Sequence, residues 1–252
     1  MIELRSFAKI NLGLEITGKR ADGYHTLRTI FQTIDLSDVL RLQEKPLPRI
    51  TLKGSDRSVA WDDSNTIARA CRLIYDNYPL RSGFDIRVSK NIPPGSGLGG
   101  GSGNAAVMLL FLNQYFNLNI PISELNEMAA TLGADVPFFL LGGTVLGEGI
   151  GELLNPLPEI RSRSIALFIP PLRVSTALIF SRWRLTKPLF PSKIKLFLRR
   201  SDFSILENEL ENVTFELFPE IREIKRKMLR GGCDLVQMTG SGSAVFAIGP
   251  AN

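Results

Sequence analysis

Residues 93–104 of the chain read Pro-Pro-Gly-Ser-Gly-Leu-Gly-Gly-Gly-Ser-Gly-Asn. Six of the nine positions from 95 to 103 are glycine, whereas the chain-wide frequency of 22 in 252 residues gives about one for a stretch of that length. An alternating segment at 84–88 predicts a strand before this run, and the apolar segment 105–116 predicts a buried helix after it. Glycines between a strand and a helix expose backbone N–H groups that bind anions.

This glycine run therefore predicts a phosphate-binding loop. A flexible hinge or a tight turn is the structural alternative, although either needs only one or two glycines. The residues that we expect to bind the nucleotide are Pro93, Pro94, Gly95, Ser96, Gly97, Leu98, Gly99, Gly100, Gly101, Ser102 and Gly103.

Other known phosphate loops fit the run less well. A Walker A loop would close with Lys-Ser or Lys-Thr, and the run does not. Gly95-x-Gly97-x-x-Gly100 formally matches the dinucleotide fingerprint, but no clear acidic residue ends a second strand about 20 residues later. The His-Arg-Asp and Asp-Phe-Gly motifs of protein kinases are also missing from the sequence.

The composition is typical of a soluble globular protein, with 44% hydrophobic and 22% charged residues. No apolar run approaches the roughly 20 residues that cross a bilayer. The two cysteines, Cys71 and Cys233, predict neither a disulfide framework nor a metal site. The single histidine, His25, lies in a turn-like segment, and no Gly-x-Ser-x-Gly elbow supports a hydrolase. Proton transfer is therefore expected from a carboxylate or a lysine.

The net charge of +5 arises partly from residues 181–200, which hold many Lys and Arg side chains and no acidic one. Such a run is usually a solvated face, although it would also steer a polyphosphate toward the protein. No nucleic-acid-binding signature accompanies it, so we expect neither nucleic acid nor a membrane as a partner. Residues 1–5 lack the features of a signal peptide, which predicts a cytoplasmic location. A monomer or a homodimer is expected.

The element pattern predicts an α+β architecture with mixed or antiparallel sheets and two lobes, which divide near residue 151 into 1–151 and 152–252. The N-terminal lobe would hold the phosphate loop and the catalytic residues. Strands are expected at 4–16, 84–88, 165–169, 235–238 and 244–248, and as a pair at 26–36 and 39–43. Helices are expected at 65–75 with Ser64 as cap, at 105–116, at 123–132 and over 203–228.

Three motifs in this order resemble the GHMP kinases, a family that includes galactokinase and the homoserine and mevalonate kinases. The first is Ala-Lys-Ile-Asn-Leu at 8–12, the second is the glycine run continued by Asn-Ala-Ala at 104–106, and the third is Thr-Gly-Ser-Gly-Ser at 239–243. The resemblance implies a two-lobed fold with the active site between the lobes. It also implies ATP as co-substrate, with Mg²⁺ accompanying the nucleotide.

A narrower resemblance within this family involves residues 18–27, Gly-Lys-Arg-Ala-Asp-Gly-Tyr-His-Thr-Leu, and 133–139, Gly-Ala-Asp-Val-Pro-Phe-Phe. It implies a small-molecule substrate, a cytidine-diphosphate-linked methylerythritol of the non-mevalonate isoprenoid route. Another kinase of the family and a non-catalytic nucleotide-binding module are the alternatives. The family's chains continue beyond the third motif, so we expect a shortened C-terminal lobe here.

The resemblance also implies the catalytic residues. Asp135 resembles the base that accepts the proton of the substrate hydroxyl, and a carboxylate suits a phosphoryl transfer. Lys9 resembles its partner, which would orient Asp135 and neutralise charge on the transferring group. The structural alternatives are a helix cap beside Pro137 for Asp135 and a solvated side chain for Lys9.

Five residues resemble the family's substrate contacts. Tyr24 offers a ring face for a pyrimidine, and His25 has a donor and an acceptor for the edge of cytosine, although a core tyrosine and a turn histidine are the ordinary interpretations. The expected substrate-binding residues are Asn11, Tyr24, His25, Thr176 and Phe180. On the nucleotide side, Asn65 and Lys90 lie where the family approaches adenine, and Ser102 is a candidate for holding Mg²⁺, whose ligands the sequence leaves unknown.

Overall fold

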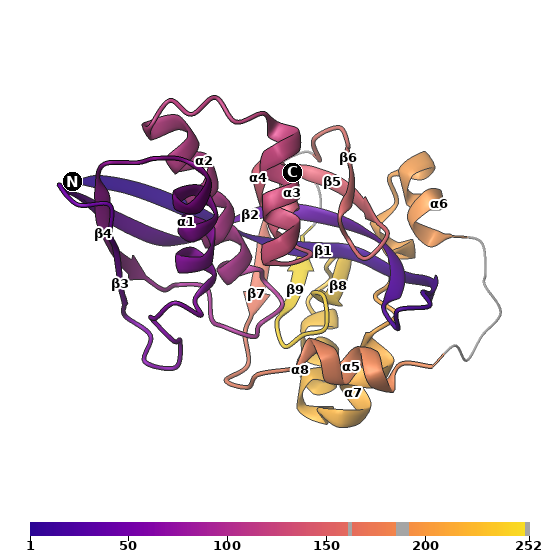
Figure 1. Ribbon diagram of the computed structural model, residues 1–252. Helices are drawn as coiled ribbons and strands as arrows, with labels where there is room; N and C mark the ends of the chain where they lie inside the picture. Colours follow the sequence, from indigo (N-terminus) through magenta and orange to yellow (C-terminus); the bar gives the residue numbers. More distant parts are fainter. Residues whose placement is uncertain (161–162, 185–191, 250–252) are drawn as a thin grey trace. The chain divides into compact units, whose positions relative to one another are not determined.

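The structure, a computed structural model, describes residues 1–160, 163–184 and 192–249 (Figure 1). It contains two compact units. The first combines residues 1–8, 34–94 and 99–142, and the second combines 9–33, 95–98 and 143–252. The strands β1 (Ile2–Lys19) and β2 (His25–Lys45) each contribute residues to both units. The division into lobes at residue 151 stays a prediction.

In the first unit, helices pack against a sheet that includes the strand with the alternating pattern predicted from the sequence. Strand β4 (Gly83–Ser89) pairs antiparallel with the second half of β2, and β3 (Ile50–Gly54) pairs parallel with β4. Phe84 and Ile86 of β4 point into the core, where they are buried. The helices are α1 (Thr66–Asn77), α2 (Gly100–Tyr115), α3 (Ile122–Leu132) and α4 (Val136–Leu141), and α1 and α2 lie side by side (Figure 1).

The second unit has two sets of paired strands. The first half of β2 pairs antiparallel with β5 (Thr144–Glu148), which pairs with β6 (Leu153–Pro156). A separate antiparallel sheet has the order β7-β9-β8. Its strands are β7 (Ile165–Phe168), β8 (Leu235–Met238) and β9 (Val245–Ile248).

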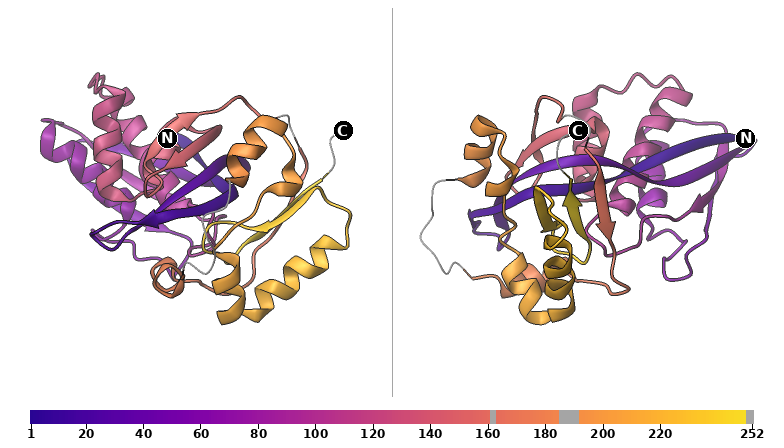
Figure 2. Two further views of the ribbon diagram at one scale, coloured as in Figure 1. Left: turned by 90° about the vertical axis from the view of Figure 1, so that its right-hand side faces the viewer. Right: turned by 180° about the vertical axis from the view of Figure 1, so that it is seen from behind.

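Helices of the second unit pack beside this three-stranded sheet, and α8 lies against β8 and β9 (Figure 2). Leu210, Phe215 and Ile221 bury their side chains in the same apolar cluster as Val236 and Val245. Burial of such side chains contributes about 1.5–3 kcal/mol each, which holds the third motif at the end of β8. The helical elements are α5 (Thr176–Arg182), α6 (Lys193–Arg200), a 3-10 turn (Phe203–Ile205), α7 (Glu211–Leu217) and α8 (Pro219–Leu229).

The α+β class is confirmed, but three local predictions were wrong. The expected strand pair at 26–36 and 39–43 is one continuous strand, β2, because Asp38 is buried and bonded rather than placed in a turn. The cap of α1 is Asn65 and not Ser64, since Asn65 Oδ1 accepts from the Ile67 N–H. The helix expected over 203–228 is divided into three pieces, and Pro219 begins the last of them.

Within the described residues, none of the helices has both the length and the apolar character needed to span a membrane.

Candidate active site

The first and third motifs meet in the second unit around the side chain of Asn11. Lys9, which is 3% exposed, donates from Nζ to Asn11 Oδ1 at 2.7 Å. The backbone N–H of Asn11 donates to Thr239 Oγ1 at 2.9 Å, and Asn11 Nδ2 donates to Thr29 Oγ1 at 2.8 Å. The Lys9 ammonium also lies 5.4 Å from the centroid of the Phe31 ring. Lys9 is therefore a buried, oriented cation and not a solvated side chain.

The start of the glycine loop packs against both motifs in the same unit. Lys9 N–H donates to the Leu98 carbonyl at 3.0 Å, and Ala244 N–H donates to the Ser96 carbonyl at 3.0 Å. Gly97 has φ +80°, and a Cβ there would lie 2.4 Å from the Thr239 carbonyl oxygen. Only glycine combines this backbone conformation with so close an approach. Residues 95–98 are thus fixed by the motifs on either side of them in space.

The rest of the glycine loop opens α2 in the first unit. Gly99, at φ 74°, caps the helix without a side-chain bond. A Cβ on the buried Gly100 would lie 2.8 Å from Ile92 Cγ2, so a larger residue at this position would collide with Ile92. Gly101 is exposed, and a Cβ there would meet only Thr66 Oγ1, at 3.6 Å. The helix start leaves N–H groups unpaired by other helical carbonyls, which suits an anion.

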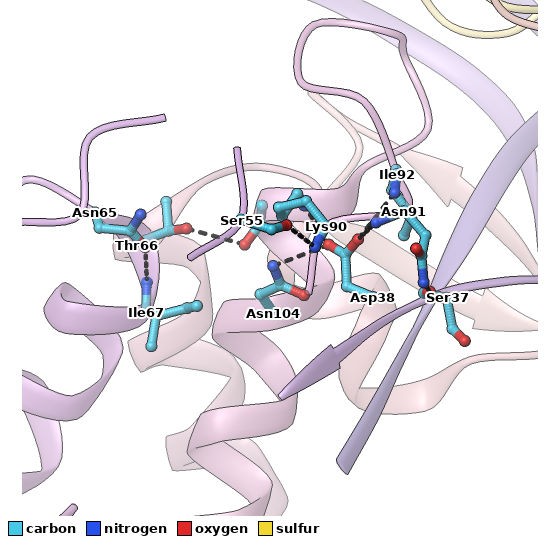
Figure 3. Close-up of polar contacts among 11 residues, drawn as sticks. Ser37, Asp38, Ser55, Asn65, Thr66, Ile67, Lys90, Asn91, Ile92 and Asn104 are labelled. Carbon is cyan, nitrogen blue, oxygen red and sulfur yellow. Dashed lines mark hydrogen bonds and ion pairs between the residues drawn. The ribbon is translucent and has the colours of Figure 1, made fainter. Parts of the chain in front are cut away.

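Asn65 and Lys90 of the expected nucleotide site both have structural contacts in the first unit (Figure 3). Asn65 caps α1 with Oδ1, and its Nδ2 donates to the Ala60 carbonyl at 2.7 Å. Lys90 forms an ion pair with Asp38, and its backbone N–H donates to Ser55 Oγ at 2.9 Å. Asp38 is a residue of this neighbourhood that the sequence analysis missed, because it lies between the two strands expected at 26–36 and 39–43.

Asp135 occupies the N-cap position of α4 in the first unit. Its carboxylate makes no capping hydrogen bond, and Pro137 follows in the first turn. Asp135 therefore stands at the position of a helix cap, but its side chain makes no capping hydrogen bond. Asp135 is half-buried and precedes a helix of apolar residues, Val136–Leu141.

The hairpin between β1 and β2 carries the aromatic residues of the expected substrate site. Tyr24 is 63% exposed, so it is not a core tyrosine. The His25 ring lies 5.7 Å from the Phe180 ring and 5.5 Å, edge to face, from the Trp183 ring. Burial, and secondarily the positive charge of Lys19, lower the pKa of His25 from its usual 6.5. The imidazole is thereby biased toward its neutral form.

Trp183 is an aromatic residue of this site that sequence reasoning missed. It follows Phe180 by three positions and caps the C-terminus of α5, a spacing that places both rings on one face. That spacing was the available signal in the sequence. Thr176, at the start of α5, shares a hydrogen bond with Ser241 of the third motif at 2.8 Å. Thus α5 is attached to the third motif at one end and to His25 at the other.

Among the described residues, no group of three or more His, Cys, Asp or Glu side chains could hold a metal ion. Mg²⁺ in nucleotide sites is bound by one or two protein groups together with phosphate oxygens and waters, so it does not require such a group. Ser102, in the first turn of α2, is half-buried. It has the hydroxyl oxygen that such a site needs.

Two segments of the chain match two parts of one family. The family profile described as GHMP kinases N terminal domain matches residues 65–143, and that described as GHMP kinases C terminal matches residues 194–252. Together with the arrangement of the three motifs, these matches define the class: the chain belongs to the GHMP kinase family, which consists of ATP-dependent small-molecule kinases.

Relatives within the family carry a more particular name. The chain is 38% identical over 256 residues to 4-diphosphocytidyl-2-C-methyl-D-erythritol kinase of Lachnoclostridium phytofermentans, with 98% of this chain and 88% of the relative covered. A crystal structure of 4-(cytidine 5'-diphospho)-2C-methyl-D-erythritol kinase superposes with a TM-score of 0.84 at 37% identity, covering 99% of this chain and 91% of that one. Homoserine kinase from Cytophaga hutchinsonii, at 18% identity, TM-score 0.71 and coverages of 99% and 86%, shares the fold.

Proposed function

We propose that the protein transfers the γ-phosphate of ATP to a hydroxyl of 4-diphosphocytidyl-2-C-methyl-D-erythritol, a step of non-mevalonate isoprenoid precursor synthesis. The observation that carries the proposal is the cluster of Lys9, Asn11 and Thr239, which joins the first and third motifs to the start of the glycine loop. Relatives of nearly full length that bear this enzyme's name support the choice of substrate.

In the proposed reaction the substrate hydroxyl oxygen attacks the γ-phosphorus, and the bond from phosphorus to the bridging oxygen of ADP breaks. Asp135 accepts the proton of the hydroxyl, in keeping with a carboxylate that is not used as a helix cap. Lys9 contributes a fixed positive charge, which stabilises the negative charge on the transferring phosphoryl group. Such fixed charges act more strongly in a buried site than in water, and Lys9 is almost fully buried.

The nucleotide is proposed to bind along residues 93–103. The exposed Gly101 and the start of α2 would face the phosphates, while Gly97 and Gly100 shape the loop. Asn65 and Lys90 would contact adenine through atoms that their structural bonds leave available. Mg²⁺ would neutralise phosphate charge when bound, with Ser102 as the candidate protein ligand.

The cytidine end of the substrate is proposed to bind at the hairpin. Phe180 and the exposed Tyr24 would offer ring faces to cytosine, and neutral His25 would pair with its polar edge. Asn11 and Thr176 would contact the rest of the substrate. We further propose a cytoplasmic location, and a monomer or a homodimer.

A homoserine or mevalonate kinase activity is the alternative within the family. The aromatic cluster of His25, Phe180 and Trp183 favours the cytidine substrate, because homoserine and mevalonate carry no base to stack. A non-catalytic nucleotide-binding module is disfavoured because the chain has both Lys9 and Asp135, the two residues that resemble the family's catalytic pair.

The deciding experiment measures ADP release with the cytidine substrate, with homoserine and with mevalonate. We expect turnover with the cytidine substrate alone, and a loss of about 10²–10⁴-fold in kcat for Asp135→Asn with ATP binding retained. Turnover of homoserine or mevalonate would reassign the substrate. ATP binding without turnover of any acceptor would indicate a binding module.

A further inference from the structure

The carboxylate of Asp38 is the most heavily bonded buried acid among the described residues that the proposed chemistry does not use. Asp38 is 0% exposed and lies in the middle of β2. Its Oδ1 accepts from the backbone N–H groups of Asn91 at 2.8 Å and Ile92 at 2.9 Å. Its Oδ2 accepts from Lys90 Nζ and from Asn104 Nδ2, the latter at 3.1 Å.

These donors lie at the two ends of the glycine loop (Figure 3). Residues 90–92 immediately precede the loop, and Asn104 is in the second turn of α2, just beyond the last glycine. Asn91 adds a bond from its Nδ2 to the Ser37 carbonyl at 2.7 Å, so the entry to the loop is fixed to β2 by neighbouring residues. One carboxylate thus bonds to the chain both before and after residues 93–103.

A buried carboxylate in this position holds its donors strongly. Hydrogen bonds to a charged acceptor are roughly twice as strong as neutral ones, and the Lys90 ammonium balances the charge. The same segment contacts the loop itself, since a Cβ on Gly100 would lie 2.8 Å from Ile92 Cγ2 and 3.0 Å from Lys90 Nζ. Moving residues 90–92 away from Asp38 would therefore change the position of the loop's helical end.

We propose that Asp38 is a positioning residue that holds both ends of the phosphate loop at a fixed separation and so sets the affinity for ATP. The proposal rests on the proposed function only in taking the loop as the ATP site. Asp38 acts through Asn91, Ile92 and Asn104, and has no contact with the acceptor substrate in this scheme. Its loss should weaken ATP binding far more than acceptor binding.

The test is calorimetric titration of MgATP into the full chain without acceptor substrate, on Asp38→Asn, Asn104→Ala and the double variant. Asp38→Asn should weaken MgATP binding about tenfold, which corresponds to about 1.4 kcal/mol. Asn104→Ala removes the hydrogen bond from α2 to Asp38 but keeps the ion pair between Asp38 and Lys90. It should weaken MgATP binding about threefold. The double variant should resemble Asp38→Asn, because both changes remove one shared bond.

Asp85→Asn is the matched control. Asp85 lies on β4, which pairs with β2, and it bonds to Thr51 of β3 and Lys45 of β2, but it is partly exposed and away from the loop. Its removal should leave MgATP affinity unchanged. Native-state hydrogen exchange should show faster exchange of the Asn91 and Ile92 amides in Asp38→Asn and no change in Asp85→Asn.

Two outcomes would overturn the proposal. If folded Asp38→Asn and Asn104→Ala bind MgATP as tightly as the wild type while melting earlier, Asp38 is a stability residue only. If the losses multiply in the double variant, the two residues do not act through one contact. Should Asp38→Asn fail to fold, the MgATP affinity of Asn104→Ala alone decides: a loss supports the proposal, and wild-type affinity overturns it. Since no acceptor is present, an error in the assigned substrate leaves these readouts unaffected, whereas wild-type protein that binds no MgATP refutes the proposed function itself.

Discussion

The second unit contains two polar regions of opposite character. Around Asn11, buried side chains bond to one another, and Lys9 is 3% exposed. Around His25, aromatic rings meet at 5.5–5.7 Å, and Tyr24 beside them is 63% exposed. The first region is fixed by hydrogen bonds before any ligand arrives, whereas the second consists of ring contacts beside an exposed tyrosine. The difference suggests that rate depends on the buried region and substrate choice on the exposed one.

The largest expected effect comes from removing the buried charge. Lys9→Met should lower kcat by about 10²–10³-fold, the usual loss when one preorganised electrostatic group is removed, with little change in acceptor KM. Lys19→Met is the matched control for kcat, because Lys19 lies on the same strand and is exposed. A kcat for Lys9→Met within a few fold of wild type, in a folded variant, would make the buried region merely structural.

The packing of the buried region can be tested at two glycines of the loop. Gly95 and Gly97 both have positive φ, +72° and +80°, so alanine strains either backbone by about 1–2 kcal/mol. A Cβ at 97 would also collide with the Thr239 carbonyl, whereas one at 95 would only touch the side chain of Arg173 at 3.4 Å. Overpacking adds about 1–3 kcal/mol, so Gly97→Ala should lose more stability than Gly95→Ala in denaturant unfolding. Equal losses would contradict tight packing there.

A smaller effect is expected at the exposed region, in the choice of base. A uridine analogue reverses donor and acceptor at the edge facing His25, so wild-type kcat/KM should favour the cytidine substrate at least tenfold, or about 1.4 kcal/mol. His25→Ala should remove most of this preference. Tyr24→Ala should weaken both substrates alike, because stacking does not distinguish them. Competition kinetics measures the preference between the two substrates in the wild type and in both variants. Equal use of the two substrates by the wild type would refute recognition of the base by His25.

The smallest expected effect is a pH dependence carried by His25. Its folded pKa is lowered from 6.5 by burial and then by Lys19, so the unfolded chain binds the proton first as the pH falls. The contribution of this group to the free energy of unfolding is therefore fully present above pH 6.5, and it decreases as the pH falls through the folded pKa. Acceptor KM should rise over the same range, because a protonated ring has no acceptor nitrogen. His25→Ala should give a flat KM profile, and Lys19→Met should move the rise to higher pH.

The sequence predicts best where the pattern is local. The alternation at 84–88 and the apolar run after the loop correspond to β4 and α2. The prediction failed where tertiary contacts override local chemistry. Ser-Asp at 37–38 is typical of turns, yet the amides of residues 91–92 satisfy Asp38, so the strand continues. Likewise α1 begins at Thr66, so Asn65 and not Ser64 occupies the cap position, although both residue types are favoured caps.

The candidate site shows the same limit. Lys9 and Asn11 could be selected from the first motif, but the bond between Asn11 and Thr239 joins residues 228 positions apart, which no local pattern indicates. Trp183 had a signal in its spacing from Phe180, while its contact with His25 depends on how α5 packs. The roles of Asp135 and Tyr24 stay predictions, to be tested by the variants above, and the role of Phe180 stays a prediction as well.

Strands β1 and β2 also restrict how this protein can be rebuilt. Because each of them contributes residues to both compact units, no single cut in the gene separates one unit from the other. Exchanging a whole unit with a family member would need junctions inside paired strands, where every residue has a fixed register. The turn at residues 20–24, between the two strands, is instead a short surface segment that carries Tyr24. Grafting such turns between relatives is therefore the practical route to altered substrate choice in a chimera.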